Sequence, residues 1–331
     1  MGRVVGESGN AEGDFRGFAR VGIVGLGLIG GSIALAIRER WPETVIVGVD
    51  RPEALAEAVT RGAIAHGVPR VAALADEHLD VVVLAAPVLQ SIACLQELRD
   101  ATTRPLLVTD VGSTKLSIVL ASRADSNPYL TFVGGHPIAG AAHGGIMHAR
   151  TDLFRGRPWL FTPDATTPAA AMEKLSGFVR GFGAETATID PAEHDRVMAY
   201  ISHLPQLASS ALMRVAGENV GAPGFALSGA GLADTTRLAS SPASMWTEIL
   251  QSNADHVRAA LDAFIGDLQI LRDRLTSPEA SGEWLEAGAR WRAELAASNG
   301  TAPASTPAPA AAPASAPALG ESTRLKPEVT R

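Results

Sequence analysis

Lysine and cysteine are both scarce in this chain of 331 residues. Lys115, Lys174 and Lys326 are its only lysines, and Cys94 is its single cysteine. One cysteine cannot form a disulfide within a chain, which is typical of proteins from a reducing compartment. Acidic residues outnumber basic residues by 35 to 28, for a net charge of -7. We therefore expect no nucleic-acid partner.

Long apolar runs are also missing. No apolar segment reaches the roughly 18 residues that a membrane-spanning helix needs. The first twenty residues lack the apolar core of a signal peptide. We therefore predict a cytoplasmic protein that has no membrane partner. No His, Cys, Asp and Glu residues have the spacing of a metal site, so we expect no metal either.

The most informative motif is GLGLIG at residues 25–30. It follows an apolar run at 21–24 and opens a predicted helix that extends over 32–40. This is the sequence context of a dinucleotide-binding turn. In such a turn Gly25 allows the tight bend, Gly27 lets a pyrophosphate approach the backbone, and Gly30 lets the helix pack closely on the sheet.

The residues around this motif favour NAD as the cofactor. The phosphates would lie on the free amides at the start of the helix. A second apolar run, 45–49, ends at Asp50, whose carboxylate would accept hydrogen bonds from ribose hydroxyls and repel a 2′-phosphate. Arg51 lies beside it and could tolerate that phosphate, so NADP stays open. We also assign to the cofactor site Leu28, Ile29, Ala86 and Pro87.

Short apolar runs alternate with helical segments from residue 19 to about residue 190. The predicted strands are 21–24, 45–49, 81–85, 106–109, 130–133, 159–161 and 185–189. Continuous apolar strands separated by helices indicate a largely parallel sheet that is buried on both faces. We predict an α/β fold with a Rossmann-type dinucleotide-binding domain over 19–190, preceded by a disordered lead over 1–18.

The pattern changes at Pro191, a residue that can begin a helix. Helical spacing then continues with a kink expected at Pro205, and a Gly-rich loop is predicted at 217–233. The remaining pattern predicts an all-helical domain over 191–296. The Ala/Pro-rich segment 297–331 cannot bury enough apolar surface to fold, so we expect a disordered tail.

A single helix is predicted from Pro242 to about Leu275. At 1.5 Å per residue it would span roughly 50 Å, too long for one small lobe to cover. We therefore expect this helix to pack against a second subunit. A last helix is predicted near 279–296.

Two polar segments follow neighbouring predicted strands. DVGSTK follows 106–109, and GGHPIAG follows 130–133. Ligands of open α/β sheets lie outside the carboxyl ends of the strands, so Ser113 and His136 are expected near the nicotinamide. A neutral histidine can take a proton from a hydroxyl while hydride leaves the same carbon. Ser113 would orient that hydroxyl or the imidazole; its alternative role is to cap the next helix.

Six segments carry a family resemblance: GLGLIGGS, DVGSTK, GGHPIAG, EHDRVMAYISHLPQ, GLADTTRLA and SPASMW. In this order they resemble the prephenate and arogenate dehydrogenases of tyrosine biosynthesis, over about residues 20–275. The resemblance implies an NAD-dependent oxidoreductase that oxidatively decarboxylates a cyclohexadienol. It further implies that His136 contacts the ring hydroxyl with Ser113 beside it, and that the helical domain forms an intertwined homodimer.

The resemblance also implies a set of substrate-binding residues. Arg237 would bind a substrate carboxylate, for which a planar guanidinium is well suited, and a surface ion pair is its alternative role. His203 and Asp195 lie in a segment that the resemblance places near the cofactor and substrate. Trp246 is assigned to the substrate site by its position, with a role in the core as the alternative.

Two departures from the family pattern argue against feedback by tyrosine, and the first of them also bears on the substrate. Many relatives have an acidic residue shortly after the GHPIAG segment, where this chain has Ala141, Ala142 and His143, and Gln206 stands where relatives often have histidine. The ammonium of arogenate normally requires a nearby carboxylate. We therefore predict oxidation of prephenate to 4-hydroxyphenylpyruvate, with arogenate as the alternative substrate.

Two other classes of protein were weighed. The β-hydroxyacid dehydrogenases combine a similar pair of domains but depend on a lysine in the helical domain, and 191–296 contains none. A non-catalytic NAD-binding sensor is the alternative outside the enzymes. Such a sensor would need neither Ser113, His136 nor Arg237.

Overall fold

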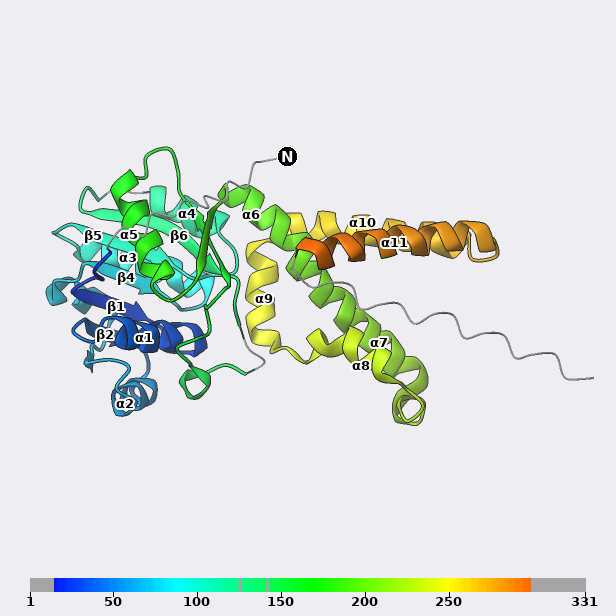
Figure 1. The fold of residues 1–331 in the computed structure, drawn as a ribbon, viewed down its shortest axis with the longest axis horizontal. Helices are drawn as coiled ribbons and strands as arrows, with labels where there is room; N and C mark the ends of the chain where they lie inside the picture. Colours follow the sequence, from blue (N-terminus) through cyan, green and yellow to red (C-terminus); the bar gives the residue numbers. More distant parts are fainter. Residues whose placement is uncertain (1–14, 125–126, 141–142, 299–331) are drawn as a thin grey trace, which may run out of the picture. The chain divides into compact units, whose positions relative to one another are not determined.

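The structure, a computed structural model, describes residues 15–124, 127–140 and 143–298 (Figure 1). The predicted lead falls outside the described residues up to residue 14, and the predicted tail does so from residue 299. Contacts divide the chain into two compact units, residues 1–264 and 265–331.

Within the described residues, eight strands form one sheet. They are β1 (Arg20–Val24), β2 (Val45–Val49), β3 (His66–Gly67), β4 (Val81–Leu84), β5 (Leu106–Asp110), β6 (Leu130–Pro137), β7 (Pro158–Thr162) and β8 (Glu185–Thr188). The spatial order is β3-β2-β1-β4-β5-β6-β7-β8. Only the β6–β7 pair is antiparallel in this sheet as described. The first six strands have the order of a dinucleotide-binding fold, so the predicted fold class is confirmed.

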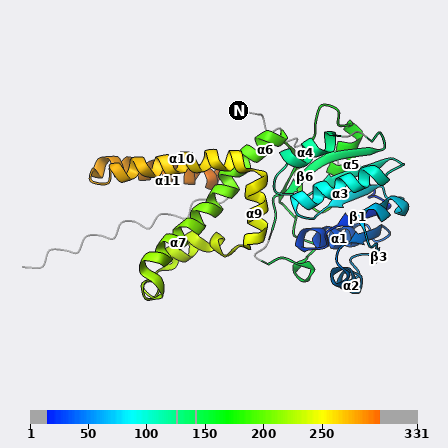
Figure 2. The ribbon, with the colours of Figure 1, turned by 180° about the vertical axis from the view of Figure 1, so that it is seen from behind.

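Helices cover both faces of this sheet, as the opposite views of Figures 1 and 2 show. One apolar core contains residues of α1 (Leu28–Arg40), α2 (Pro52–Thr60) and α5 (Ala169–Arg180). The other contains residues of the 3-10 helix η1 (Val71–Glu77), α3 (Val88–Ala101) and α4 (Leu116–Arg123). The strands are therefore apolar on both sides, which is why they read as continuous apolar runs.

The remaining described elements are helical. After the 3-10 turn η2 (Ile146–His148), they are α6 (Pro191–Met198), a π-helical turn η3 (Ala199–His203), α7 (Leu204–Phe225), α8 (Ala230–Thr236), a 3-10 turn η4 (Arg237–Ser240), α9 (Ala243–Ser252), α10 (Ala254–Asp273) and α11 (Pro278–Ser298). No helix in the described ranges is both long enough and apolar enough to cross a membrane.

The prediction of one helix from 242 to about 275 is wrong. α9 ends at Ser252, and α10 begins at Ala254, because Asn253 has the non-helical backbone angles φ -126° and ψ 29°. The Asn253 side chain donates to the carbonyl oxygen of Asp195, 2.7 Å away. This contact with α6 stabilises the non-helical conformation of Asn253. The spacing of apolar residues in the sequence cannot predict such a contact.

Other boundaries also differ from prediction. The predicted loop at 217–233 is largely helical, since α7 continues to Phe225 across an interruption at Gly221 and α8 follows. α1 begins at Leu28, four residues before the predicted start. The short β3 was not predicted. Residues 15–18, predicted as part of a disordered lead, pack through Phe15 and Phe18 on aromatic rings of α5, with both centroids within 6.4 Å of Phe178.

The second unit is described from Ile265 to Ser298. In it, the end of α10 and α11 are joined by a hydrogen bond of 2.9 Å from the Trp284 indole to the Asp267 carboxylate. Many large apolar side chains of this unit are exposed: Ile265, Leu268, Ile270, Leu275, Leu285, Trp291 and Leu295. Such a density of exposed apolar residues marks a surface that another chain can cover.

Candidate functional site

The Gly-rich turn lies where the strand order reverses. β1 is flanked by β2 and β4, and the loops that leave β1 and β4 border the crevice in which α/β folds bind ligands. Gly25 has φ +90°, and a Cβ there would lie 2.6 Å from the carbonyl oxygen of Ala85. A Cβ on Gly30 would lie 1.9 Å from the carbonyl oxygen of Gly25, whereas nothing lies within 4 Å of one on Gly27. A side chain would therefore clash at Gly25 and Gly30, whereas the space beside Gly27 is free.

Asp50 lies beside this turn at the end of β2. Its carboxylate accepts a hydrogen bond of 2.6 Å from the Leu26 amide and one of 2.7 Å from the Arg51 amide. The Arg51 side chain is 86% exposed and lies 3.9 Å from the same carboxylate. Asp50 therefore fixes the Gly-rich turn, a role that sequence reasoning missed.

A cavity of about 510 Å³ adjoins the turn. Its walls come from the starts of α1 and α3, the loop after β5, and α9, and its lining includes four residues predicted from the sequence: Ile29, Ala86, Pro87 and Ser113. From α9 come Ser244, Met245, Glu248 and Ile249. The Glu248 carboxylate also accepts a hydrogen bond of 2.5 Å from the Leu89 amide at the start of α3. One wall of the cavity therefore comes from a helix far along the sequence.

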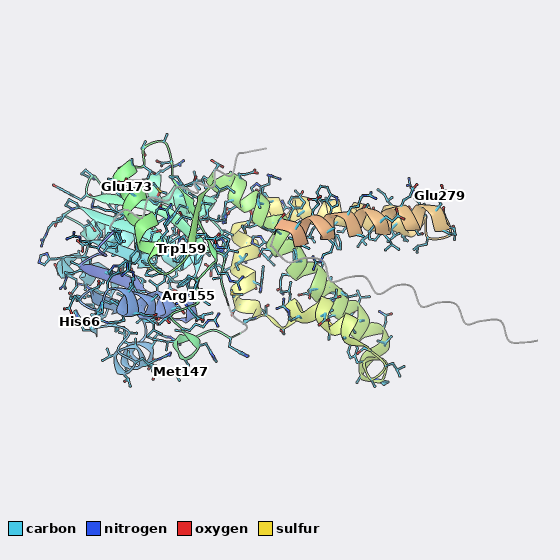
Figure 3. The ribbon with its side chains drawn as sticks, in the orientation of Figure 1. His66, Met147, Arg155, Trp159, Glu173 and Glu279 are labelled. Atoms are coloured by element: carbon cyan, nitrogen blue, oxygen red, sulfur yellow. The ribbon has the colours of Figure 1, made fainter. Side chains whose placement is uncertain are left out.

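The sequence pattern predicted that His136 follows the end of a strand. The structure instead places it within β6. The first part of β6 pairs with β5, and residues 134–137 pair with β7, where Pro137 lies opposite Trp159. Trp159, which is labelled in Figure 3, is buried. Desolvation, with the nearby side chains of His194, Lys115 and His203, holds the pKa of His136 well below its usual range. His136 is therefore neutral at neutral pH and can accept a proton.

A buried ion pair supports the loop that carries Ser113. The Lys115 ammonium contacts the Asp110 carboxylate and donates to the carbonyl oxygen of Gly135 at 2.7 Å. Asp110 also accepts from the Gly135 amide at 3.0 Å and from the Gly112 amide at 2.8 Å. Burial lowers the pKa of Lys115, and the Asp110 carboxylate opposes that shift. The pair ties the loop after β5 to the strand that bears His136.

Asp195 was predicted to bind substrate, but its carboxylate is occupied by the protein. It is 1% exposed, and it accepts hydrogen bonds from the amides of Lys115, at 2.7 Å, and Leu116, at 2.9 Å. It lies 2.7 Å from the Nδ1 of His194, whose Nε2 lies 2.8 Å from the Nδ1 of His136. Asp195 therefore reaches the site only through His194.

Sequence reasoning did not assign His194 to the site. It is fully buried, and its position in the segment EHD was the one available signal. Desolvation lowers its pKa, while the Asp195 carboxylate opposes that shift. The contact to His136 spans 58 residues of sequence, so only the fold brings the two rings together.

His203 and Trp246 lie together on the helical side of this cluster. The π-helical turn that ends at His203 changes the helical register before Pro205, and such turns occur often at functional sites. The His203 ring is 1% exposed and lies 5.9 Å, edge to face, from the Trp246 ring. Burial lowers the pKa of His203 to about 4. The Trp246 indole nitrogen and the Gln206 amide oxygen are both buried without a partner among the described protein atoms.

Arg237 lies apart from these contacts. It begins the 3-10 turn η4 and is exposed, and its guanidinium makes no hydrogen bond or ion pair with the described residues. The structure therefore does not bring Arg237 into the His136 cluster of this single chain, and its role stays a prediction.

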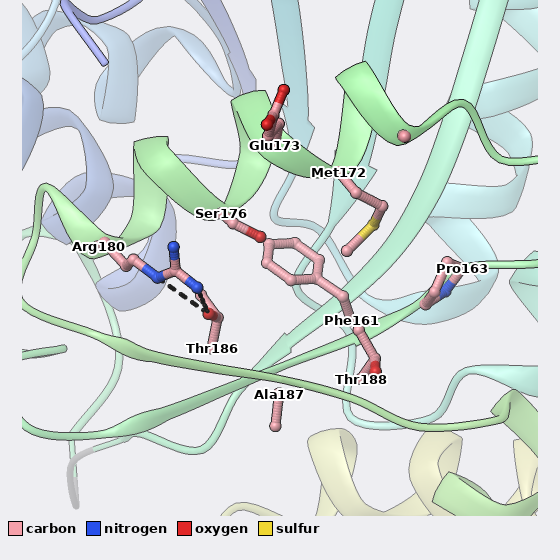
Figure 4. A pocket seen from close by; sticks show the side chains of 10 residues that line it. Phe161, Pro163, Met172, Glu173, Ser176, Arg180, Thr186, Ala187 and Thr188 are labelled. Atoms are coloured by element: carbon pink, nitrogen blue, oxygen red, sulfur yellow. Dashed lines mark hydrogen bonds between the residues drawn. The ribbon is translucent and has the colours of Figure 1, made fainter. Parts of the chain in front are cut away.

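A second cavity, of about 410 Å³, lies between β7, β8 and α5 (Figure 4). The Phe161 ring and the Met172 side chain line it, and the guanidinium of Arg180 donates to the Thr186 hydroxyl at 2.9 Å. None of the residues predicted from the sequence lines this cavity. In the described ranges of the chain, no group of three or more His, Cys, Asp or Glu side chains is arranged to hold a metal ion.

Two family models match the chain. Residues 33–188 match "Prephenate dehydrogenase, nucleotide-binding domain", and residues 190–286 match "Prephenate dehydrogenase, dimerization domain". Among curated proteins, the prephenate dehydrogenase of Bacillus subtilis is 34% identical over 262 residues, which cover 78% of this chain and 70% of that protein.

Solved structures give the same similarity. The crystal structure of prephenate dehydrogenase from A. aeolicus, in complex with hydroxyphenyl propionate and NAD+, has a TM-score of 0.77 at 29% identity, covering 84% of this chain and 98% of that one. The Synechocystis arogenate dehydrogenase has a TM-score of 0.69 at 29% identity, covering 82% of this chain and 99% of that one.

Proposed function

Because the chain belongs to the prephenate dehydrogenase family, we propose that it oxidises prephenate to 4-hydroxyphenylpyruvate with NAD. Hydride would leave the ring carbinol carbon for the nicotinamide, carbon dioxide would be lost, and the ring would become aromatic. The observation that carries the proposal is a neutral His136 held beside the loop of Ser113, which lines the cavity next to the Gly-rich turn.

The residues present fit a dinucleotide. The open space at Gly27 leaves room for a pyrophosphate against the first amides of α1. Asp50, at the end of β2, would accept hydrogen bonds from a ribose. NAD supplies the hydride acceptor when it is bound. Ile29, Pro87 and Met245 give the adjoining cavity apolar walls, which would reduce the access of water to the reacting carbon once substrate is bound.

His136 would act as the general base. It would accept the proton of the ring hydroxyl as hydride leaves, which avoids a high-energy oxocarbenium ion. Ser113 would orient that hydroxyl. His203 and Trp246 would border the ring, and Arg237 would bind a substrate carboxylate.

Prephenate is proposed over arogenate because the segment that follows His136 has no acidic residue before Asp152, and because the buried carboxylates of Asp110 and Asp195 are occupied. Asp110 is paired with Lys115, and Asp195 accepts backbone amides. An ammonium group brought here would lack a free counter-charge. Gln206 offers only a neutral amide. Arogenate remains the second candidate because the similar Synechocystis structure is that of an arogenate dehydrogenase.

The test is a direct comparison of substrates. Purified protein is given NAD with prephenate or with arogenate, and absorbance at 340 nm is followed. We expect kcat/KM to be at least tenfold higher for prephenate. Faster turnover of arogenate would overturn the substrate while leaving the reaction class, and turnover of neither substrate would favour the NAD-binding sensor.

We also propose that the protein acts as a homodimer in the cytoplasm. Its C-terminal part matches the family's dimerization domain, and α11 and the end of α10 expose a dense set of apolar side chains. Burial of these side chains against a second copy would remove them from water.

A further inference from the structure

Three side chains form a buried line behind the site. The Nδ1 of His136 lies 2.8 Å from the Nε2 of His194, and the Nδ1 of His194 lies 2.7 Å from a carboxylate oxygen of Asp195. His194 and Asp195 are neighbours on α6, a helix whose start is capped by the Asp190 carboxylate. His194 is fully buried and Asp195 is 1% exposed, so water does not compete for these bonds.

The hydrogen-bonding chemistry of these groups determines where each proton lies. Both carboxylate oxygens of Asp195 accept a backbone amide, so the group acts as an acceptor toward His194. His194 must therefore carry its proton on Nδ1. A neutral His194 then has a lone pair on Nε2, which can only accept from the Nδ1 of His136. The Nε2 of His136 is left without a hydrogen.

We propose that Asp195 and His194 are positioning residues that hold His136 in the tautomer protonated on Nδ1, so that its Nε2 lone pair faces the ring hydroxyl. This inference rests on the proposed function for the identity of that hydroxyl. The assignment of protons follows from this chain's own contacts. The same carboxylate caps the first turn of α4, so the orientation of the base and the position of the Ser113 loop are set together.

The charges around His136 are consistent with this arrangement. His194 and His203 are neutral at neutral pH because their pKa values are lowered. The Lys115 ammonium is paired with the Asp110 carboxylate and is also attracted by the Asp195 carboxylate. A proton taken up by His136 during the reaction would thus be stabilised through His194 by a buried anion.

The decisive variant is Asp195→Asn. The Lys115 amide and His194 share Oδ1 of Asp195, whereas the Leu116 amide binds Oδ2, so an asparagine oxygen can keep only one of the two backbone amides. With that oxygen on the Leu116 amide, the amide nitrogen faces His194 as a donor. His194 would then accept at Nδ1 and donate from Nε2, and His136 would be forced to carry its proton on Nε2. In serine proteases the equivalent aspartate-to-asparagine change lowers kcat about 10⁴-fold by fixing the wrong tautomer. We expect a loss of about 10²- to 10⁴-fold in kcat, with a KM change of less than about fivefold.

Two further variants separate this role from support of the fold. His194→Gln keeps an acceptor close to the position of Nε2, so we expect it to retain more activity than His194→Leu, which has none. Asp190→Asn is the matched control, because Asp190 caps the same helix without contacting His136. It should leave kcat within about twofold of the parent.

The tautomer itself can be measured without turnover. Protein labelled with ¹⁵N in its eight histidines is examined by long-range ¹H–¹⁵N correlation, with His136→Asn used for assignment. We expect the Nδ1-protonated form of His136 in the parent and in Asp190→Asn, and the Nε2-protonated form in Asp195→Asn. If Asp195→Asn does not fold, His194→Leu must show a mixed population of the two tautomers.

A parent His136 protonated on Nε2, or a tautomer that does not respond to these changes, would overturn the inference. This readout is independent of the reaction. A parent with the expected tautomer but without turnover of either substrate would overturn the proposed function alone.

Discussion

His136 lies in a strand, and its surroundings lower its pKa. Because the neutral form is the base, its catalytic competence is retained as pH falls through 6.5 and is lost only below the lowered pKa. We expect kcat to stay near its maximum at pH 6 and to fall on further acidification.

His136→Asn should lower kcat by about 10²- to 10⁴-fold across this pH range. NAD affinity, measured by fluorescence titration, should be unchanged; activity within a few-fold of the parent would remove His136 from this role.

Asp50 is expected to set cofactor choice. Asp50→Ser removes the ribose acceptor and the repulsion of a 2′-phosphate, while Arg51 remains beside that phosphate. The ratio of kcat/KM for NAD to that for NADP should fall by at least tenfold. Some loss of affinity for both cofactors is also expected, because Asp50 holds the Leu26 amide of the turn. A parent that already prefers NADP would contradict this interpretation.

Arg237 should affect the KM for the substrate and not the affinity for NAD. Truncation of one partner in a desolvated charge pair costs roughly 2 to 5 kcal/mol, which is more than tenfold in apparent affinity. Arg237→Ala should therefore raise the KM for prephenate more than tenfold without changing NAD affinity. Arg214→Ala, at an exposed ion pair on α7, is the control and should change neither. An unchanged KM would mean that Arg237 is a surface residue.

At the scale of elements, the connection between β5 and α4 depends on a buried ion pair. Lys115→Met would leave the Asp110 carboxylate buried without its partner, which typically costs 3–5 kcal/mol. We expect a decrease of about that size in the free energy of unfolding, measured in urea. Combining it with Asp110→Leu should restore part of the loss.

The exposed lysine of α5 provides the comparison. Lys174→Met should change the free energy of unfolding by less than about 0.5 kcal/mol. An equal effect of the two lysine substitutions would show that the buried pair has no special importance for stability.

Local patterns predicted the elements of the sheet but not the contacts around His136. The Gly-rich turn and the apolar strands are encoded within short segments, so their positions follow from spacing alone. The contact of His194 with His136 and the role of Asn253 join residues 58 positions apart. The π-helical turn before His203 and the break between α9 and α10 likewise depend on packing between elements, which periodicity does not record.

At the scale of the whole molecule, we expect two copies of the chain to associate. The second unit exposes Leu285, 64% accessible, and Trp291, 77% accessible. Trp291→Asp combined with Leu285→Asp would bring charge into a dimer interface, and we expect light scattering to show the mass of one chain where the parent shows two. Lys174→Asp, the same introduced acid on α5, should leave the parent mass unchanged. A monomeric parent would contradict the proposed homodimer.

The transfer of hydride from the ring to NAD is the step on which the proposed function depends. It is measured most directly with prephenate that carries deuterium at the ring carbinol carbon. We predict that deuterium appears on C4 of the reduced nicotinamide, with one carbon dioxide released for each cofactor reduced and with His136→Asn strongly impaired. Binding of NAD without any reduction by either prephenate or arogenate would contradict the proposed function.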